Sequence, residues 1–417
     1  MTKRVVIVGG GVIGLCAAWY ALQRGLRVTV LERNAADRDG CSYGNAGMIV
    51  PSHFVPLAAP GMVALGLKWM WNPESPFYIK PRPSLDLLRW SWKFWRSCTR
   101  AHVQRSAPLL RDLHLASRAC YEELADGWSN EFGLARNGLL MLCATQQALD
   151  EEAHTAAQAR QLGIPAEVLD AAAVAALDPD VRMSVQGGVY FPRDCHLSPG
   201  RFMAGLQSRL SEAGCDLRWN VDVIGFDRRG PHVHAVHTSQ GSLEADEIVL
   251  AGGSWSPVIA RGLGLRLPMQ AGKGYSLTLP EPRQLPRICS IFTEARVAVT
   301  PMGSSLRFGG TMEMSGLNED VMPARVRGII NSVPKYYPAF RPEDFEGIMP
   351  WRGLRPCSPD GLPYLGRPRN CDNVVIATGH AMMGLSLAPI TGRLVSQMLL
   401  AEKPEIDVGL LSPDRFG

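Results

Sequence analysis

Residues 5–32 of the chain read VVIVGGGVIGLCAAWYALQRGLRVTVLE, and this stretch decides the fold. A β-branched run at 5–8 is followed by a G-x-G-x-x-G pattern, a helix-forming run that ends near Gly25, and a second β-branched run at 27–31. This order of strand, glycine turn, helix and strand is typical of the βαβ unit that binds dinucleotides. The sequence therefore predicts an α/β protein with a doubly wound, Rossmann-like sheet and a nucleotide at its first turn.

The three glycines of the pattern have separate physical tasks. Gly9 permits the tight turn, Gly11 lets the backbone approach a pyrophosphate at the helix N-terminus, and Gly14 permits close packing of the helix on the strand. Glu32 ends the second strand, where a carboxylate accepts hydrogen bonds from a ribose 2′-hydroxyl and repels a 2′-phosphate. The pattern therefore disfavours NADP and leaves NAD and FAD open.

The choice between NAD and FAD depends on the C-terminal part of the chain. Residues 373–378 are predicted to form a buried strand that runs into a glycine turn at Gly379 and His380, and 384–400 are predicted to form a helix. The positive end of such a helix would face the cofactor ring. A positive charge there stabilises a reduced flavin, whereas a nicotinamide does not need it. We therefore expect FAD, and an NAD-dependent dehydrogenase is the alternative that the glycine pattern alone allows.

The composition excludes several classes of protein. With 417 residues, 46% hydrophobic and 20% charged, the chain suits two to three folded domains and is neither disordered nor fibrous. A net charge of +4 with scattered basic residues gives little support to nucleic-acid binding. Ten cysteines without a C-x-x-C pair or zinc-type spacing predict no metal site and a reduced, cytoplasmic protein. Glycines within the apolar run at 5–22 argue against a signal peptide or a spanning helix.

The alternation of predicted strands and helices indicates two interleaved domains. One is a discontinuous FAD-binding domain, and the other is an α+β substrate-binding domain threaded through it. We expect the first to comprise 1–50, 185–260 and 351–417, and the second to comprise 51–184 and 261–350.

Five sequence blocks, spread over nearly the whole chain, resemble one family. The first is the glycine pattern with Glu32. The other four are Ser42-Tyr43-Gly44-Asn45-Ala46-Gly47, Lys273-Gly274-Tyr275-Ser276, Trp351-Arg352-Gly353-Leu354-Arg355-Pro356 with Pro359-Asp360-Gly361, and Gly379-His380 with Leu387-Ala388-Pro389. In their order and spacing they resemble the D-amino-acid dehydrogenase branch of the glycine oxidase and D-amino-acid oxidase superfamily of flavoproteins. The chain departs from that pattern at 381–383, where many relatives have glycine or a larger polar residue, and this leaves the substrate and the electron acceptor open.

The resemblance implies that an amino acid is oxidised by hydride transfer from Cα to FAD. It implies D-amino acids as donors, D-proline and D-hydroxyproline types included, and a quinone-like electron acceptor. No general base is obligatory if the amine binds deprotonated, because the protein then supplies position and electrostatics. The alternatives are a glycine, sarcosine or L-amino-acid oxidase that uses O2, and a non-catalytic flavin subunit of a larger assembly.

The resemblance also implies roles for three side chains at the substrate. Arg355 is expected to bind the substrate carboxylate through its planar guanidinium, and the alternative is an ion pair with Asp360 or another structural acid. Tyr275 is expected to add a hydroxyl to the same carboxylate or to stack on the substrate, and the alternative is a half-buried core tyrosine. His380 is expected either to face the flavin or to be a turn histidine with its own hydrogen bonds.

The remaining site residues concern the flavin, and two of them have two interpretations each. For Lys273 we favour an exposed turn over a place at the flavin edge, and for Cys357 an inert buried thiol over covalent flavin attachment. The residues expected to bind FAD are Gly9, Gly11, Val12, Ile13, Gly14, Glu32, Arg33, Ser42, Asn45, Ala46, Gly47, Met48, Val223, Gly252, Trp255, Gly353, Gly379, Met383, Gly384 and Leu385.

An aromatic and basic stretch at 68–96 is the remaining feature. Half of the ten tryptophans lie here, interleaved with lysine and arginine. One interpretation is a peripheral contact with anionic lipid on the inner face of a membrane, which suits electron delivery to a quinone. The other is a substrate-domain helix packed by its aromatic residues. The tryptophans are Trp69, Trp71, Trp90, Trp92 and Trp95.

Overall fold

The N-terminal βαβ unit forms as the sequence predicts. The computed structural model describes residues 2–70 and 72–416. Strands β1 (Arg4–Val8) and β2 (Arg27–Leu31) pair in parallel along their full lengths, and helix α1 (Val12–Gln23) connects them.

β1 lies inside a six-stranded sheet with the order β19, β20, β13, β1, β2, β9. All neighbours are parallel except β19, which runs antiparallel to β20 at one edge. Side chains of the central strands alternate between two cores, so that Val5 and Ile7 join one and Val6 and Val8 join the other. The added strands are β9 (Asp216–Arg218), β13 (Glu247–Leu250), β19 (Tyr364–Gly366) and β20 (Val374–Thr378).

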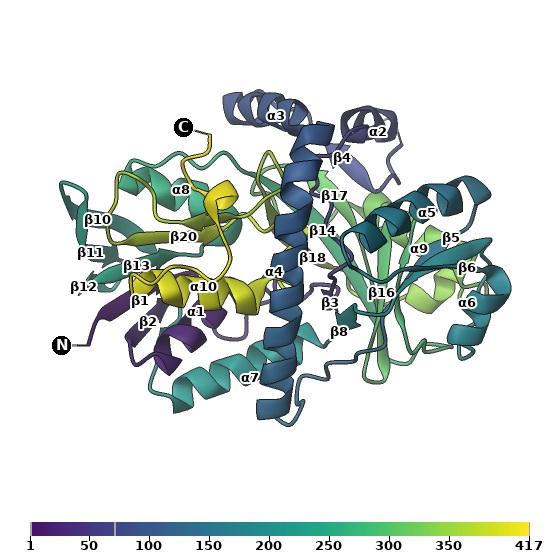
Figure 1. The fold of residues 1–417 in the computed structure, drawn as a ribbon, viewed down its shortest axis with the longest axis horizontal. Helices are drawn as coiled ribbons and strands as arrows, with labels where there is room; N and C mark the ends of the chain where they lie inside the picture. Colours follow the sequence, from purple (N-terminus) through teal and green to yellow (C-terminus); the bar gives the residue numbers. More distant parts are fainter. Residues whose placement is uncertain (1, 71, 417) are drawn as a thin grey trace.

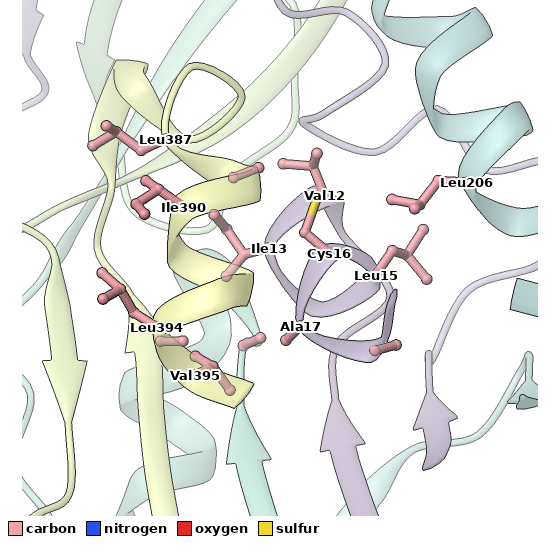
Figure 2. Packing of buried hydrophobic residues seen from close by; sticks show 14 of the residues in the cluster. Val12, Ile13, Leu15, Cys16, Ala17, Leu206, Leu387, Ile390, Leu394 and Val395 are labelled. Atoms are coloured by element: carbon pink, nitrogen blue, oxygen red, sulfur yellow. The ribbon is translucent and has the colours of Figure 1, made fainter. Parts of the chain in front are cut away.

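Helices cover one face of this sheet. α1 lies beside the C-terminal helix, and Figure 2 shows the apolar side chains that meet between them. The two helices approach closely at Gly392, where a Cβ atom would lie 2.5 Å from the backbone carbonyl carbon of Cys16. The helices that complete this layer are α4 (Arg100–Gly127), α7 (Pro199–Glu212) and α10 (Ala388–Leu399).

A small antiparallel sheet covers the opposite face. Its apolar residues Val233 and Val236 belong to the same core as Val6 and Val8 of β1. The Rossmann-like sheet is therefore the middle of three layers. The strands of the small sheet are β10 (Val223–Arg229), β11 (His232–Thr238) and β12 (Gly241–Glu244).

A nine-stranded mixed sheet forms the second lobe, on the other side of α4 in Figure 1. Helix α9 (Pro323–Tyr336) packs on one of its faces, and α5 (Gln146–Gln161) packs on the other. β7 and β18 pair within this sheet, although both lie in ranges expected for the FAD-binding domain. The strands are β4 (Phe77–Ile79), β5 (Leu139–Cys143), β6 (Glu167–Asp170), β7 (Gly187–Phe191), β14 (Gln270–Leu279), β15 (Cys289–Phe292), β16 (Val297–Met302), β17 (Ser305–Met314) and β18 (Trp351–Cys357).

Two strands and four helices complete the elements described here. Strands β3 (Met48–Ile49) and β8 (Cys195–His196) form an antiparallel pair. The other helices are α2 (Met62–Trp69), α3 (Leu85–Ser97), α6 (Ala171–Leu177) and α8 (Ser256–Ala260).

The helix expected at 384–400 begins four residues late, at Ala388, after a 3₁₀ turn at Ala381–Met383. Pro389 explains the difference, because proline has no N–H to donate and is favoured only in the first turn of a helix.

Candidate active site

A cavity of about 1020 Å³ is lined by residues of both large sheets. Its wall includes the turn after β1, the segment at 40–46, the ends of β13 and β20, and parts of β14, β17 and β18. The carboxyl ends of parallel strands are where ligands bind in open α/β sheets. The position and size of the cavity suit a dinucleotide together with a small substrate.

The glycine turn leaves the backbone open to this cavity at one position only. A Cβ atom at Gly9 would lie 2.4 Å from the Ala251 carbonyl oxygen, and one at Gly14 would lie 1.9 Å from the Gly9 carbonyl oxygen. At Gly11 the nearest atom, Ser42 Oγ, would be 3.7 Å away. Gly9 and Gly14 are therefore required by packing, whereas Gly11 leaves the N-terminus of α1 open to a ligand. The first N–H group of that helix, on Val12, donates to Ser42 Oγ at 3.0 Å.

Glu32 is a buried carboxylate at the nucleotide end. Its Oε2 accepts a hydrogen bond from the Gly10 N–H at 2.9 Å, and its Oε1 accepts one from the Asn34 N–H at 3.0 Å. A carboxylate has about four acceptor positions, so Glu32 keeps capacity for ribose hydroxyls. Arg38, which the sequence analysis did not single out, has its Nε 3.9 Å from Glu32 Oε2, stacks on Trp219 and lines the cavity.

The segment at 40–46 is held from the second lobe. Arg307 of β17 donates to the carbonyl oxygens of Tyr43 at 2.9 Å and Asn45 at 2.8 Å, and Ser276 Oγ donates to that of Gly44 at 3.2 Å. Burial lowers the pKa of Arg307 to about 10. The ring of Trp351 packs directly on Gly44, where a Cβ atom would lie 2.0 Å from it.

Most residues predicted to bind FAD line the cavity. Three do not: Gly14 and Gly47 pack against backbone carbonyls, and Gly353 packs against the Trp351 ring. The lining residues are Gly9, Gly11, Val12, Ile13, Glu32, Arg33, Ser42, Asn45, Ala46, Met48, Val223, Gly252, Trp255, Gly379, Met383, Gly384 and Leu385.

Arg355 places a guanidinium at the cavity and has no carboxylate partner among the described residues. It donates to the Thr311 carbonyl oxygen, and the thiols of Cys41 and Cys357 lie close to it. Burial lowers the pKa of Arg355. Asp360, the alternative partner, instead forms an ion pair with Arg415 at 2.7 Å. Gly274 on β14 gives the guanidinium its space, since a Cβ atom there would lie 2.3 Å from it.

Tyr275 lines the cavity, but both hydrogen-bonding roles of its hydroxyl are taken by protein groups. The hydroxyl donates to Glu313 Oε2 at 2.7 Å and accepts from the Met322 N–H at 3.2 Å. Lys273 is fully buried and lies 3.2 Å from Glu313 Oε1. The expectation of an exposed turn for Lys273 is therefore wrong, because β14 is paired on both sides, with β17 and β18.

His380 follows β20 and is buried. Its Nε2 bonds to Thr391 Oγ1 at 3.1 Å, and burial lowers its pKa to about 3, so the ring is neutral. His380 lines the cavity and also has its own hydrogen bond, so the role expected for it at the flavin stays a prediction. Cys357 is buried and does not line the cavity, and burial raises its pKa to about 12.

The sequence analysis also missed His53, which lines the cavity beside the buried pair β3–β8. Its Nδ1 lies 3.0 Å from Ser52 Oγ. No motif marks this residue. Its neighbour Ser52 bonds to Asp194, which is more than 140 residues away in the sequence and is brought close only by the pairing of β3 with β8.

These residues fit FAD. The open backbone at Gly11 and the helix N-terminus suit a pyrophosphate, and Glu32 keeps acceptor capacity for a ribose. Residues of the segment at 40–46 and of the turn at 379–385 line the same cavity.

Comparison with known proteins agrees with this fit. A family model described as FAD dependent oxidoreductase matches residues 4–398. The D-amino acid dehydrogenase of Bradyrhizobium diazoefficiens is 33% identical over 424 residues, which cover 99% of each chain. The D-amino acid dehydrogenase of Granulibacter bethesdensis is 32% identical, again over 99% of each chain.

Solved structures share the fold. Glycine oxidase from Geobacillus kaustophilus has a TM-score of 0.79 with 24% identity over 99% of each chain. L-Proline dehydrogenase from P. horikoshii has a TM-score of 0.75 with 17% identity, and the match covers 100% of this chain and 98% of that one. The chain thus belongs to the family of FAD-dependent oxidoreductases and uses FAD as its cofactor.

Proposed function

We propose that this enzyme oxidises D-amino acids to imino acids and passes the electrons to a quinone-like acceptor. The proposal is supported by the full-length similarity to proteins named D-amino acid dehydrogenase and by the cavity cation Arg355. FAD supplies the acceptor for the hydride that leaves the substrate Cα. The chain's own residues bind the substrate and keep water away from it.

Arg355 is the single observation that carries the proposal. A half-buried cation that has no carboxylate partner among the described residues is costly, so the geometry favours a ligand that brings a carboxylate. A guanidinium binds a carboxylate with two parallel hydrogen bonds, which fixes the orientation of Cα as well as its position. Apolar side chains also line the cavity, Met48, Met141 and Ile291 among them, and they help to exclude water, which strengthens such bonds.

We propose further that the enzyme docks on anionic membranes through α3. Leu85, Leu88, Trp92 and Trp95 recur at intervals of three and four residues, and their exposed fractions are 70, 65, 53 and 63%. This spacing places them on one face of the helix. Leu67 of the neighbouring helix α2 is also 59% exposed, and Figure 1 shows both helices at the same end of the molecule.

The surroundings of that face support a bilayer contact. Arg89 and Arg96 are exposed on the same helix, which suits the headgroups of anionic lipids. Trp90, by contrast, is buried and donates from Nε1 to the Cys357 carbonyl oxygen at 2.9 Å, so packing accounts for only part of the aromatic stretch. Trp71 lies outside the described residues. No helix in the described part of the chain has the length and apolar character needed to span a bilayer.

An anaerobic screen of D- and L-amino acids tests the substrate class. We expect D-amino acids, proline types included, to bleach the flavin absorbance faster than their L-enantiomers. Faster bleaching by L-amino acids would contradict the proposed handedness, and no bleaching by either series would contradict amino-acid oxidation.

A second experiment tests the acceptor. The reduced enzyme is mixed with oxygen or with a soluble quinone in a stopped-flow instrument, and flavin re-oxidation is followed. We expect the quinone to react faster at equal concentration. If oxygen reacts at least as fast, the enzyme is an oxidase.

A further inference from the structure

Asp194, Ser52 and His53 form a hydrogen-bonded chain that ends at the cavity. Ser52 Oγ donates to Asp194 Oδ2, the Ser52 N–H donates to Asp194 Oδ1 at 3.1 Å, and Ser52 Oγ lies 3.0 Å from His53 Nδ1. Antiparallel pairing of β3 with β8 brings the segments together, since Ile49 lies opposite Cys195. The chain of groups therefore rests on the fold rather than on neighbouring sequence.

The two ends of this chain have different surroundings. Asp194 is completely buried and forms no ion pair with a described residue, whereas His53 lines the cavity that also contains Arg355. His53 Nε2 has no hydrogen-bond partner among residues 2–70 and 72–416, and it is accessible from the cavity. One end is thus sealed inside the protein, and the other faces the cavity.

The ionisation of the two ends is complementary. Burial raises the pKa of Asp194 to about 7, although both hydrogen bonds from Ser52 and the charge of Arg118 act to lower it. Burial, with a smaller contribution from the charge of Arg296, lowers the pKa of His53 to about 4. The carboxyl group can therefore hold a proton near neutral pH, while the imidazole resists a positive charge. The titratable and charged groups that face this pair are His114 and Arg118 of α4, Cys195 of β8, Cys289 of β15 and Arg296 between β15 and β16.

The proposed reaction needs such a proton acceptor. A free amino acid carries an ammonium group at neutral pH, and its nitrogen then has no lone pair to stabilise the carbon from which the hydride leaves. One proton must leave the ammonium group before or during hydride transfer.

We propose that Asp194, Ser52 and His53 are a proton relay that takes this proton from the substrate ammonium group, an inference that rests on the proposed function. His53 Nε2 is the catalytic group that touches the substrate nitrogen, and Ser52 and Asp194 are positioning and accepting groups behind it.

The relay consists of three proton transfers, each along one hydrogen bond, and it leaves the imidazole neutral. An ammonium N–H bond breaks as the Nε2–H bond forms on His53. The Nδ1–H bond of His53 breaks as a new O–H bond forms on Ser52, and the original Ser52 O–H proton passes to Asp194 Oδ2. The substrate loses its positive charge, Asp194 loses its negative charge, and His53 remains neutral with its proton moved from Nδ1 to Nε2. No electrons are exchanged in this step.

The test is the pH dependence of flavin reduction in the FAD-loaded enzyme. Anaerobic stopped-flow mixing with a D-amino acid gives the rate constant from about pH 6 to about pH 10 for the wild type and for His53→Gln, Ser52→Ala and Asp194→Asn. The matched control is His154→Gln, an exposed histidine on α5. In the wild type we expect the rate to rise with pH as Asp194 loses its proton.

At about pH 7 the His53→Gln and Asp194→Asn variants should be about 100-fold slower, the scale of a positioned proton acceptor. At high pH the substrate amine is already neutral, so the variants should approach the wild-type rate, and His154→Gln should match it throughout. A loss by the same factor at every pH, or no loss at about pH 7, would overturn the relay. A wild type that no amino acid reduces would instead overturn the proposed function.

Infrared titration gives a readout that does not depend on turnover. A protonated-carboxyl band should titrate near pH 7 in the wild type, disappear in Asp194→Asn, shift its midpoint in Ser52→Ala and stay unchanged in His154→Gln. Absence of that band from the wild type between about pH 5 and about pH 9 would overturn the relay even if the enzyme turns over.

Discussion

At the nucleotide end of the cavity the carboxylate is already hydrogen-bonded to the protein backbone, whereas at the substrate end a cation faces the cavity with no carboxylate partner among the described residues. Glu32 accepts hydrogen bonds from the backbone N–H groups of Gly10 and Asn34. Arg355 has only the Thr311 carbonyl oxygen as its hydrogen-bond partner among the described residues. The nucleotide end is therefore shaped before a ligand arrives, while the substrate end leaves a charge for the ligand to neutralise.

The largest effect should come from adding a side chain at the nucleotide end, where α1 packs directly on the turn after β1. Gly14→Val places carbon atoms where a Cβ would already lie 1.9 Å from the Gly9 carbonyl oxygen, so α1 must move away from β1. Overpacking of this kind costs about 3 kcal/mol. We expect loss of bound FAD and a lower Tm, measured by the flavin-to-protein ratio and by thermal denaturation.

The matched control is Gly127→Ala at the end of α4, where a Cβ would meet no atom within 4 Å. It should keep full flavin content. A Gly14→Val protein that also keeps full flavin content would show that this packing does not shape the nucleotide end.

The next effect should come from removing the cation of the substrate end. A charge-assisted hydrogen bond contributes about 1.5–3 kcal/mol, so Arg355→Ala should lower kcat/KM for amino acids by about ten-fold to about 200-fold. Arg355→Lys keeps the charge but loses the planar fork, and its loss should be intermediate. Steady-state kinetics with a soluble dye measure both.

Decarboxylated amine analogues are the control for this prediction, because they offer Arg355 no carboxylate. Their oxidation should change much less in Arg355→Ala than that of the acids. Equal losses for amines and acids would remove Arg355 from carboxylate binding.

A third effect concerns His114, a buried histidine of α4 that contacts two cavity-lining residues, Met383 and Ser386. Burial lowers the pKa of His114 to about 3 in the folded state, while the unfolded group titrates near 6.5. Below about pH 6.5 the unfolded state takes up a proton that the folded state refuses, so stability present above that pH is lost as the pH falls. The loss is about 1.4 kcal/mol per pH unit for this one group.

Urea denaturation at about pH 7 and about pH 5 measures this loss. The loss of unfolding free energy between the two pH values should be smaller in His114→Gln than in the wild type by about 2 kcal/mol. In the exposed control His154→Gln it should equal that of the wild type. An unchanged pH dependence in His114→Gln would show that this histidine is not held neutral.

The smallest effect lies outside both ends of the cavity, on α3. Each basic residue near an anionic bilayer contributes about 1 kcal/mol, so Arg89→Ala and Arg96→Ala should each weaken vesicle binding about five-fold. Lys93→Ala should have less effect, because its Nζ already donates to the Phe416 carbonyl oxygen at 3.1 Å. Sedimentation with anionic vesicles measures binding, and activity with a soluble dye should stay unchanged. Binding that does not weaken at high salt would contradict the electrostatic part of the contact.

The nucleotide end could be predicted from sequence because its determinants are local. Gly9, Gly14 and Glu32 lie within one βαβ unit, where the spacing in the sequence determines which residues contact one another. The glycines beside Lys273 suggest an exposed turn in the sequence. In the structure, Gly274 instead leaves space for the Arg355 side chain of the neighbouring strand. That cause is visible only once β14 and β18 are paired.

The substrate end could be predicted only in part. Family resemblance pointed to Arg355, but no pattern in the sequence relates His53 to Asp194, which is more than 140 residues away. Their proximity results from two-residue strands, β3 and β8, which are too short to give a periodic signal.

The second lobe fixes the conformation of the segment at 40–46, and this links the folding of the two lobes. Arg307, Ser276 and Trp351 belong to the nine-stranded sheet, yet they fix a loop that lines the FAD cavity. Because FAD stabilises whatever conformation binds it, its binding energy acts on both lobes at once. The two lobes should therefore unfold as one cooperative unit in the FAD-loaded enzyme, and local opening of the nine-stranded sheet should release the cofactor.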